Sequence, residues 1–160
     1  AFTFDSVTPG DYRVVVTLPE SADFYVKDPT YRQDDGFVNT IHITSAEPQS
    51  LVINLGSLPG TISGSVIDDR QQAVSGIQAV LVPDRFRDRA DFYRKVTTDR
   101  NGQFTFARVP PGEYHLYAWE AIEPFAYLDP VVLQRYEANS VAVRVGEGAK
   151  LSIKVPVIPE

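Results

Sequence analysis

The sequence predicts an all-β protein: a Greek-key β-sandwich of seven strands, preceded by a partial copy of the same module. Three observations support this prediction. Short stretches of alternating apolar and polar residues recur along the chain, with turn-forming residues about every 8–15 positions. Helical periodicity is confined to residues 131–138, and one stretch of sequence occurs twice. Seven short strands separated by such turns are typical of a β-sandwich.

The strands of the complete module are expected near residues 61–67, 77–82, 93–98, 103–108, 113–119, 140–145 and 150–157. Gly60 and Gly64 indicate a close backbone approach or a bulge in the first strand, because glycine has no Cβ to obstruct a neighbour. Asn101-Gly102 predicts a hairpin, since both residue types tolerate the positive φ of a tight turn. Pro111-Gly112 suits a type II turn.

An internal repeat divides the chain. Residues 2–12 (FTFDSVTPGDY) match residues 104–114 (FTFARVPPGEY) at an offset of 102, with seven identical positions. Tyr25 falls on Tyr127 at the same offset. A match of this length and order indicates a duplicated module.

The repeat continues with a different spacing. The offset becomes 100 further along, where residues 41–43 meet 141–143 and residues 51–53 meet 151–153. We therefore expect a complete module at 58–160 and the C-terminal part of a preceding module at 1–57. The partial copy holds counterparts of only the last four strands, so it would expose an open edge. We expect it to pack against the complete module or to recruit strands from a second copy, as a strand-exchanged homodimer.

Composition excludes several classes of function. The 160 residues carry a net charge of −6 and contain no cysteine and two histidines. The charge argues against a nucleic-acid partner, and disulfides and thiolate zinc sites are excluded. No apolar run is long enough for a transmembrane helix. The chain also lacks methionine and starts within a strand-like stretch, so we expect a piece of a longer protein.

A resemblance to a known family adds to this interpretation. The residues that carry it are Gly60-Thr61-Ile62-Ser63-Gly64-Ser65-Val66, Thr98-Asp99-Arg100-Asn101-Gly102-Gln103-Phe104 and Val109-Pro110-Pro111-Gly112-Glu113-Tyr114. Together they resemble the carboxypeptidase regulatory-like repeat. The resemblance implies a prealbumin-like (transthyretin-like), Ig-like sandwich, no peptidase activity, and an origin in a large extracytoplasmic bacterial protein. Turn glycines and prolines specify a fold better than they specify a function.

Related sandwiches suggest two further roles. Collagen-adhesin B-type repeats share the fold and form a lysine–asparagine crosslink assisted by a buried acid, near the position of Glu120. The crosslink is not expected here, because residues 61–67 contain no lysine and residues 150–157 no asparagine. Sugar-binding modules with a similar sandwich suggest a carbohydrate ligand by analogy.

The strongest candidate binding residues are the aromatic side chains after Pro111-Gly112. Tyr114, Leu116 and Ala118 should face the core, so the alternation places His115, Tyr117 and Trp119 on the opposite face. These three, with Tyr127, could form an exposed platform for a sugar or a protein. Alternatively, residues 121–138 or the partial copy could fold over this face and bury it.

Other candidates have plainer explanations. The loop from Asp84 to Lys95 mixes five basic residues with three aspartates, which could bind an anionic ligand or form internal ion pairs. Asp68-Asp69, Asp34-Asp35-Gly36 and the Asp99 stretch look like turns and lack the spacing of a calcium loop. Glu120 or Glu123 could serve a hydrolase, the least favoured interpretation. No catalytic residue, metal site or cofactor is assigned.

These observations favour a non-catalytic module of a larger extracytoplasmic protein, acting as a structural spacer or a protein-interaction domain. Its expected partners are other repeats of the parent protein, and a polysaccharide or a protein. The alternative function is a carbohydrate-binding module that uses the aromatic strand face.

Overall fold

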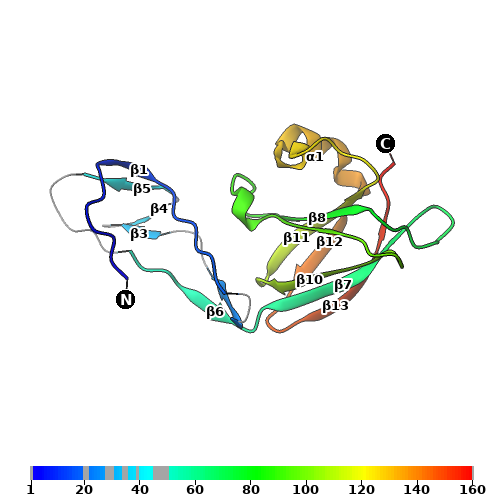
Figure 1. Ribbon diagram of the computed structural model, residues 1–160, viewed down its shortest axis with the longest axis horizontal. Helices are drawn as coiled ribbons and strands as arrows, with labels where there is room; N and C mark the ends of the chain where they lie inside the picture. Colours follow the sequence, from blue (N-terminus) through cyan, green and yellow to red (C-terminus); the bar gives the residue numbers. More distant parts are fainter. Residues whose placement is uncertain are drawn as a thin grey trace. The chain divides into compact units, whose positions relative to one another are not determined.

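A computed structural model describes residues 2–19, 22–27, 31–33, 36–38, 40–44 and 51–159. The chain divides into two compact units, residues 1–57 and 58–160. The regular elements of both units are mainly strands (Figure 1).

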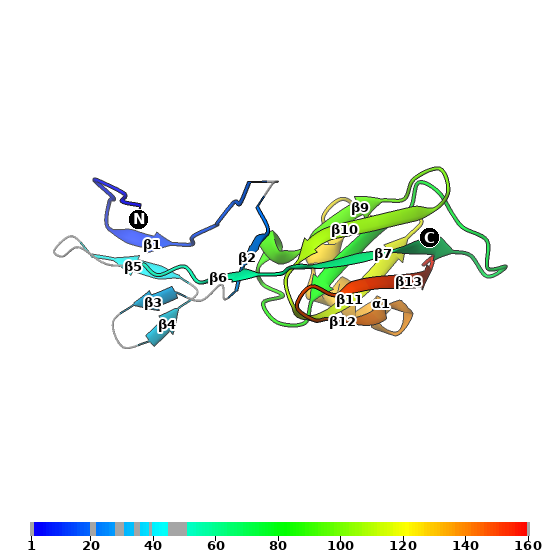
Figure 2. The same ribbon diagram turned by 90° about the horizontal axis from the view of Figure 1, so that it is seen from below.

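Residues 58–160 form a sandwich of two sheets (Figures 1 and 2). The three-stranded sheet has the order β10 (Gln103–Val109), β7 (Gly60–Ile67), β13 (Lys150–Pro156). The four-stranded sheet has the order β12 (Val141–Val145), β11 (Gly112–Trp119), β8 (Gln78–Pro83), β9 (Arg94–Thr97). All seven strands lie within one or two residues of their predicted positions. The β-sandwich prediction is confirmed.

The main core fills the space between the two sheets. From β7 it receives Ile62 and Val66, and from β11 it receives Tyr114, Leu116 and Ala118. β10 contributes Phe104 and Phe106 and, after an irregularity, Val109. This inward set is the one that the period of two predicted.

Glycine allows the central strand β7 to approach its neighbours. A Cβ on Gly64 would overlap the carbonyl oxygen of Ile153 in β13 and lie 2.9 Å from the Phe104 ring in β10. A Cβ on Gly60 would overlap the Val145 side chain. The predicted close approach at both glycines is therefore confirmed.

The turn at Asn101-Gly102 forms, but the hairpin prediction is wrong. Gly102 has a φ of 70° and donates to the carbonyl of Asp99, whose carboxylate accepts from the amides of Asn101 and Gln103. The strands on either side, β9 and β10, belong to different sheets. A tight turn fixes the local reversal of the chain, and the sheet that each strand joins depends on distant partners.

A second layer covers the outer face of the four-stranded sheet. It contains the 3₁₀ helix η2 (Ala126–Leu128), the helix α1 (Pro130–Tyr136) and the 3₁₀ helix η3 (Glu137–Asn139), which Figure 1 shows above β8 and β11. Asp129 accepts a hydrogen bond from the amide of Val131, and Pro130 occupies the first turn of α1, so both helix-start signals are present. The short helix expected near 131–138 is confirmed.

In the described residues of the 1–57 unit, the strands form three small antiparallel pairs. β1 (Gly10–Tyr12) pairs with β5 (Ile41–Ile43), β2 (Phe24–Val26) with β6 (Leu55–Ser57), and β3 (Tyr31–Gln33) with β4 (Gly36–Val38). The turn predicted at Asp34-Asp35 lies outside the described residues. Of the predicted counterpart strands, the one at the start of the chain is not formed, since residues 2–7 belong to no sheet.

The pairing register corrects the alignment of the two copies. Tyr12 lies opposite Ile41, and its equivalent Tyr114 lies opposite Val143. Ile41 therefore corresponds to Val143, two residues beyond the Val141 that the offset of 100 assigned. The offset is 102 on both strands of this pair.

Candidate functional site

The aromatic face of β11 is covered by the chain itself, which is the outcome that the alternative interpretation expected. Tyr117 and Trp119 stack at a ring separation of 5.0 Å, and Trp119 is only 1% exposed. Tyr127 of η2 and Leu133 of α1 pack on the same cluster and are also buried. The segment 121–138, which the alternative interpretation named, provides this cover.

Residues 121–138 and the outer face of the sheet form a second, smaller apolar core. From the sheet it includes Val80, Val82 and Ile158 besides the two stacked rings. Tyr136 meets Trp119 edge to face, with ring centroids 6.0 Å apart. The aromatic side chains therefore contribute packing energy within the module.

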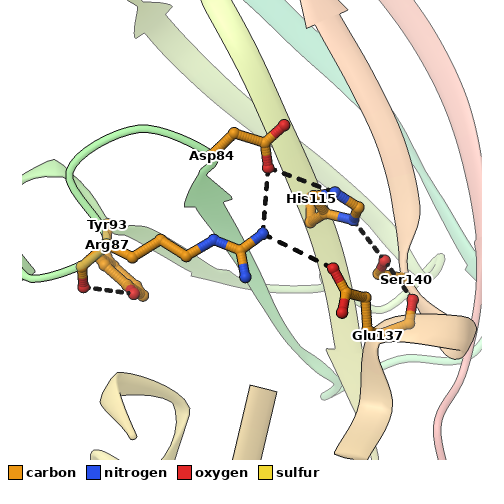
Figure 3. Close-up of polar contacts among 6 residues, drawn as sticks. All are labelled: Asp84, Arg87, Tyr93, His115, Glu137 and Ser140. Atoms are coloured by element: carbon orange, nitrogen blue, oxygen red, sulfur yellow. Dashed lines mark hydrogen bonds and ion pairs between the residues drawn. The ribbon is translucent and has the colours of Figure 1, made fainter. Parts of the chain in front are cut away.

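His115 is the one residue of the face that lies in a polar setting (Figure 3). Its Nδ1 lies 2.7 Å from Ser140 Oγ, and its Nε2 lies 3.3 Å from Asp84 Oδ1. Asp84 follows the end of β8, and Ser140 immediately precedes β12. The strands on either side of β11 thus each bring a polar partner to this histidine.

Three more side chains extend the cluster. Arg87 Nη2 lies 3.2 Å from Asp84 Oδ1 and 3.9 Å from Glu137 Oε1, and Tyr93 donates to the Arg87 carbonyl at 2.9 Å. Figure 3 shows Arg87 extending from its loop toward both carboxylates. The cluster therefore joins the loop after β8 to the segment that precedes β12.

The hydrogen bonds define the role of the serine. Ser140 Oγ donates its single proton to the carbonyl of Glu137 at 2.7 Å, so toward His115 it acts as an acceptor. A nucleophilic serine would instead give its proton to the imidazole. The Ser140–His115–Asp84 arrangement resembles a catalytic triad in residue types. The hydroxyl proton of Ser140, however, is donated to the carbonyl of Glu137.

Burial affects the ionisation of two phenols near the cluster. It raises the pKa of Tyr93 and that of Tyr117 above the ordinary value, because the phenolate would lose its hydration. The positive charge of Arg87 opposes the shift in both pKa values. Both phenols are therefore held in the neutral form at physiological pH.

The remaining sequence candidates are spread over the surface. Glu120, Glu123 and Asp129 are exposed, and Asp129 caps α1. Asp68 accepts from the amides of Arg70 and Gln72, which confirms it as a turn residue. Within the described residues, no three histidine, aspartate or glutamate side chains come together as a metal site.

The loop from Asp84 to Lys95 has internal ion pairs. Arg87 pairs with Asp84, and Arg89 forms a two-bond contact with Asp91 at 2.8 and 2.7 Å. Arg89 also lies over the Phe92 ring. These pairs match the structural interpretation of the mixed charges.

Sequence reasoning did not identify the polar cluster around His115. It missed Asp84, Arg87, Glu137 and Ser140 as neighbours, although it placed His115 on the outward face. The available signal was a polar residue on the same outward face as Tyr117 and Trp119, two positions before the first of them. Which loops meet it depends on the sheet order β12-β11-β8, which joins residues far apart in sequence.

Comparison with solved structures finds distant similarities. Among solved structures, the chain is similar to the major pilin subunit of Bacillus cereus at 14% identity, with a TM-score of 0.42 and coverage of 68% of this chain and 31% of the other. The pilus 2b backbone protein of group B streptococcus is 19% identical, with a TM-score of 0.42 and coverage of 71% of this chain and 44% of the other. The 5-hydroxyisourate hydrolase of Klebsiella pneumoniae is 18% identical, with a TM-score of 0.37 and coverage of 62% of this chain and 90% of the other. The chain thus spans less than half the length of the two pilus proteins.

A search of curated proteins finds no match. In the described part of the chain, no helix is both long and apolar enough to cross a membrane. The two sheets of residues 58–160 form the β-sandwich that the sequence predicted. The carboxypeptidase regulatory-like domain family matches residues 61–156, well over half of the chain. The chain therefore belongs to the carboxypeptidase regulatory-like domain family.

Proposed function

We propose that the chain is a non-catalytic β-sandwich module of a larger extracytoplasmic protein, acting as a structural spacer or a protein-interaction domain. The observation that carries this proposal is the covered aromatic face. The module uses its largest rings, Tyr117 and Trp119, to hold its own segment 121–138 against the sheet. Both faces of the four-stranded sheet are therefore occupied by the chain itself.

The polar cluster supports a structural role as well. His115, Asp84 and Arg87 connect the loop after β8 with the segment before β12. His115 contacts Ser140 through Nδ1 and Asp84 through Nε2. The cluster holds two loops in place across the end of β11, and Ser140 directs its proton away from the histidine.

The repeat supports a place in a series of modules. Residues 1–57 would be the C-terminal part of one module, and residues 58–160 the next. Modules in a row give a parent protein length and spacing. The extracytoplasmic location comes from the family resemblance, and other repeats of the same protein are the expected neighbours.

Tryptophan fluorescence tests the covered face directly, because Trp119 is the only tryptophan. We expect a blue-shifted emission and weak quenching by acrylamide, with no change when polysaccharides are added. A red, easily quenched emission that responds to a polysaccharide would contradict the spacer proposal and support the carbohydrate-binding alternative.

A second experiment tests the absence of catalysis. We expect no ester hydrolysis above the buffer rate in the wild-type chain. A turnover that disappears in Ser140→Ala and in His115→Gln, with folding preserved by circular dichroism, would overturn this part of the proposal.

A further inference from the structure

The first and last strands of the complete module lie side by side and run in the same direction. β7 pairs in parallel with β13 over seven consecutive residues, from Thr61 opposite Lys150 to Ile67 opposite Pro156. The start of β7 and the end of β13 therefore lie at opposite ends of one strand pair, which can be followed in Figure 2. The chain enters the module at one end of this pair and leaves it at the other.

Backbone hydrogen bonds extend the pair beyond both strands. At the entry, Gly148 donates to the carbonyl of Leu58 at 2.7 Å. At the exit, Val157 donates to the carbonyl of Ile67 at 2.9 Å. The contact between the two strands is thus continued on either side of the seven paired residues.

The chain that leaves β13 is also attached to the other sheet. Ile158 donates to the carbonyl of Ala118 at 2.7 Å, and its own carbonyl accepts from Glu120 at 2.9 Å. This short pairing with the end of β11 is parallel as well. The Ile158 side chain is buried in the second apolar core, which contains Trp119. The exit is therefore held by one strand of each sheet.

The main core shields the β7–β13 pair from water on its inner side. Val66 of β7 lies opposite Val155 of β13, and both side chains are fully buried. Gly64 lets β7 approach the backbone of β13 closely. Hydrogen bonds in such a low-dielectric setting are electrostatically stronger than in water.

Tension between the two ends of the module acts along this pair. Because the ends lie at opposite ends of two parallel neighbours, the force slides one strand past the other and loads all the hydrogen bonds between them together. If both ends lay at the same end of the pair, the same force would open the bonds one after another. Forced unfolding is governed by the unfolding rate, so simultaneous loading raises the barrier that the force has to overcome.

We propose that residues 58–160 form a tension-bearing module, which transmits force along its chain without unfolding through the shear-loaded pair of β7 and β13. This inference deepens the spacer role and rests on it, because a spacer in a row of modules carries the tension between its neighbours. It adds the direction of the load that the module resists, which is along the strands.

Single-molecule pulling of the full 1–160 chain tests the proposal, with the direction of force as the variable. The chain has no cysteine, so two introduced cysteines define the attachment points. Ser57→Cys with Pro159→Cys loads the pair in shear. Ser57→Cys with Glu147→Cys places both handles at the same end of the pair, so that β13 is peeled from β7. All three positions are exposed, and circular dichroism checks that both chains fold.

We expect the rupture force in the shear geometry to be roughly twofold or more above that in the peeling geometry, because the same bonds break together in one case and in sequence in the other. Equal rupture forces would overturn the proposal. A module that ruptures easily while Trp119 emission stays blue would overturn the tension-bearing role alone. An exposed Trp119 or an ester turnover would instead contradict the proposed function, whatever the rupture force.

Two matched truncations locate the resisting element within the shear geometry. Val155→Ala in β13 and Val143→Ala in β12 remove the same atoms from the same core, where both side chains are buried. Both should lower stability in urea, but only Val155→Ala should lower the rupture force, because β12 is outside the loaded pair. Equal loss of rupture force in the two variants would show that the force follows overall stability, which would overturn the assignment to β7 and β13.

Discussion

Leu133→Ala tests the layer that covers the aromatic face. Leu133 is 1% exposed and packs into the cluster that contains Tyr117 and Trp119. Buried leucine-to-alanine changes cost about 2–5 kcal/mol, from lost transfer energy and from the cavity left behind. α1 has only seven residues, and so short a helix is not stable alone. The expected result is therefore that the cover detaches while the sandwich stays folded.

The control is Val131→Ala in the same helix. Val131 is 65% exposed, so its truncation should change the free energy of unfolding by less than about 0.5 kcal/mol. The assay is Trp119 emission with acrylamide quenching, alongside urea unfolding followed by circular dichroism. Leu133→Ala should shift the emission to the red and increase quenching, and Val131→Ala should do neither. Equal behaviour of the two variants would refute the assignment of α1 as the cover.

Three further predictions concern the core, the phenols and the central strand. Phe106→Ala should cost about 3–5 kcal/mol in urea unfolding, and Phe4→Ala under about 1 kcal/mol; equal costs would contradict the difference in burial. Burial raises the pKa of Tyr93 and Tyr117, so stability should be fully present below about pH 10 and fall as pH rises through the raised values. Circular dichroism from pH 8 to 12 measures this loss, and Tyr117→Phe should reduce its slope. Gly64→Ala should lower the melting temperature strongly, because its Cβ would overlap the backbone of β13; an unchanged melting temperature would show that β13 can move aside.

Much of the fold could be predicted from local pattern. The period of two located all seven strands of the complete module and assigned Leu116 and Tyr117 to opposite faces, because alternation depends only on the strand itself. Gly64 was identified as a site of close approach for an equally local reason, the missing Cβ. These predictions needed no knowledge of which strands pair.

The arrangement of segments far apart in the chain could not be predicted from the sequence. The prediction of a turn at Asn101-Gly102 was correct. The prediction that this turn joins the two strands of a hairpin was wrong, because β9 and β10 belong to different sheets. The neighbours of His115 come from residue 84 and residues 137–140, which meet only through the order of strands. The two interpretations of the aromatic face differed only in the position of residues 121–138, which periodicity does not determine.

Comparing residues 2–12 with their repeat, residues 104–114, distinguishes the features that a segment forms by itself from those that need a partner strand. Residues 2–12 keep the edge-to-face pair of phenylalanine rings, the positive φ at Ser6 and the tyrosine–carbonyl hydrogen bond of residues 104–114, so these features need no partner strand. They lack the burial and the strand pairing, which the complete module obtains from β7.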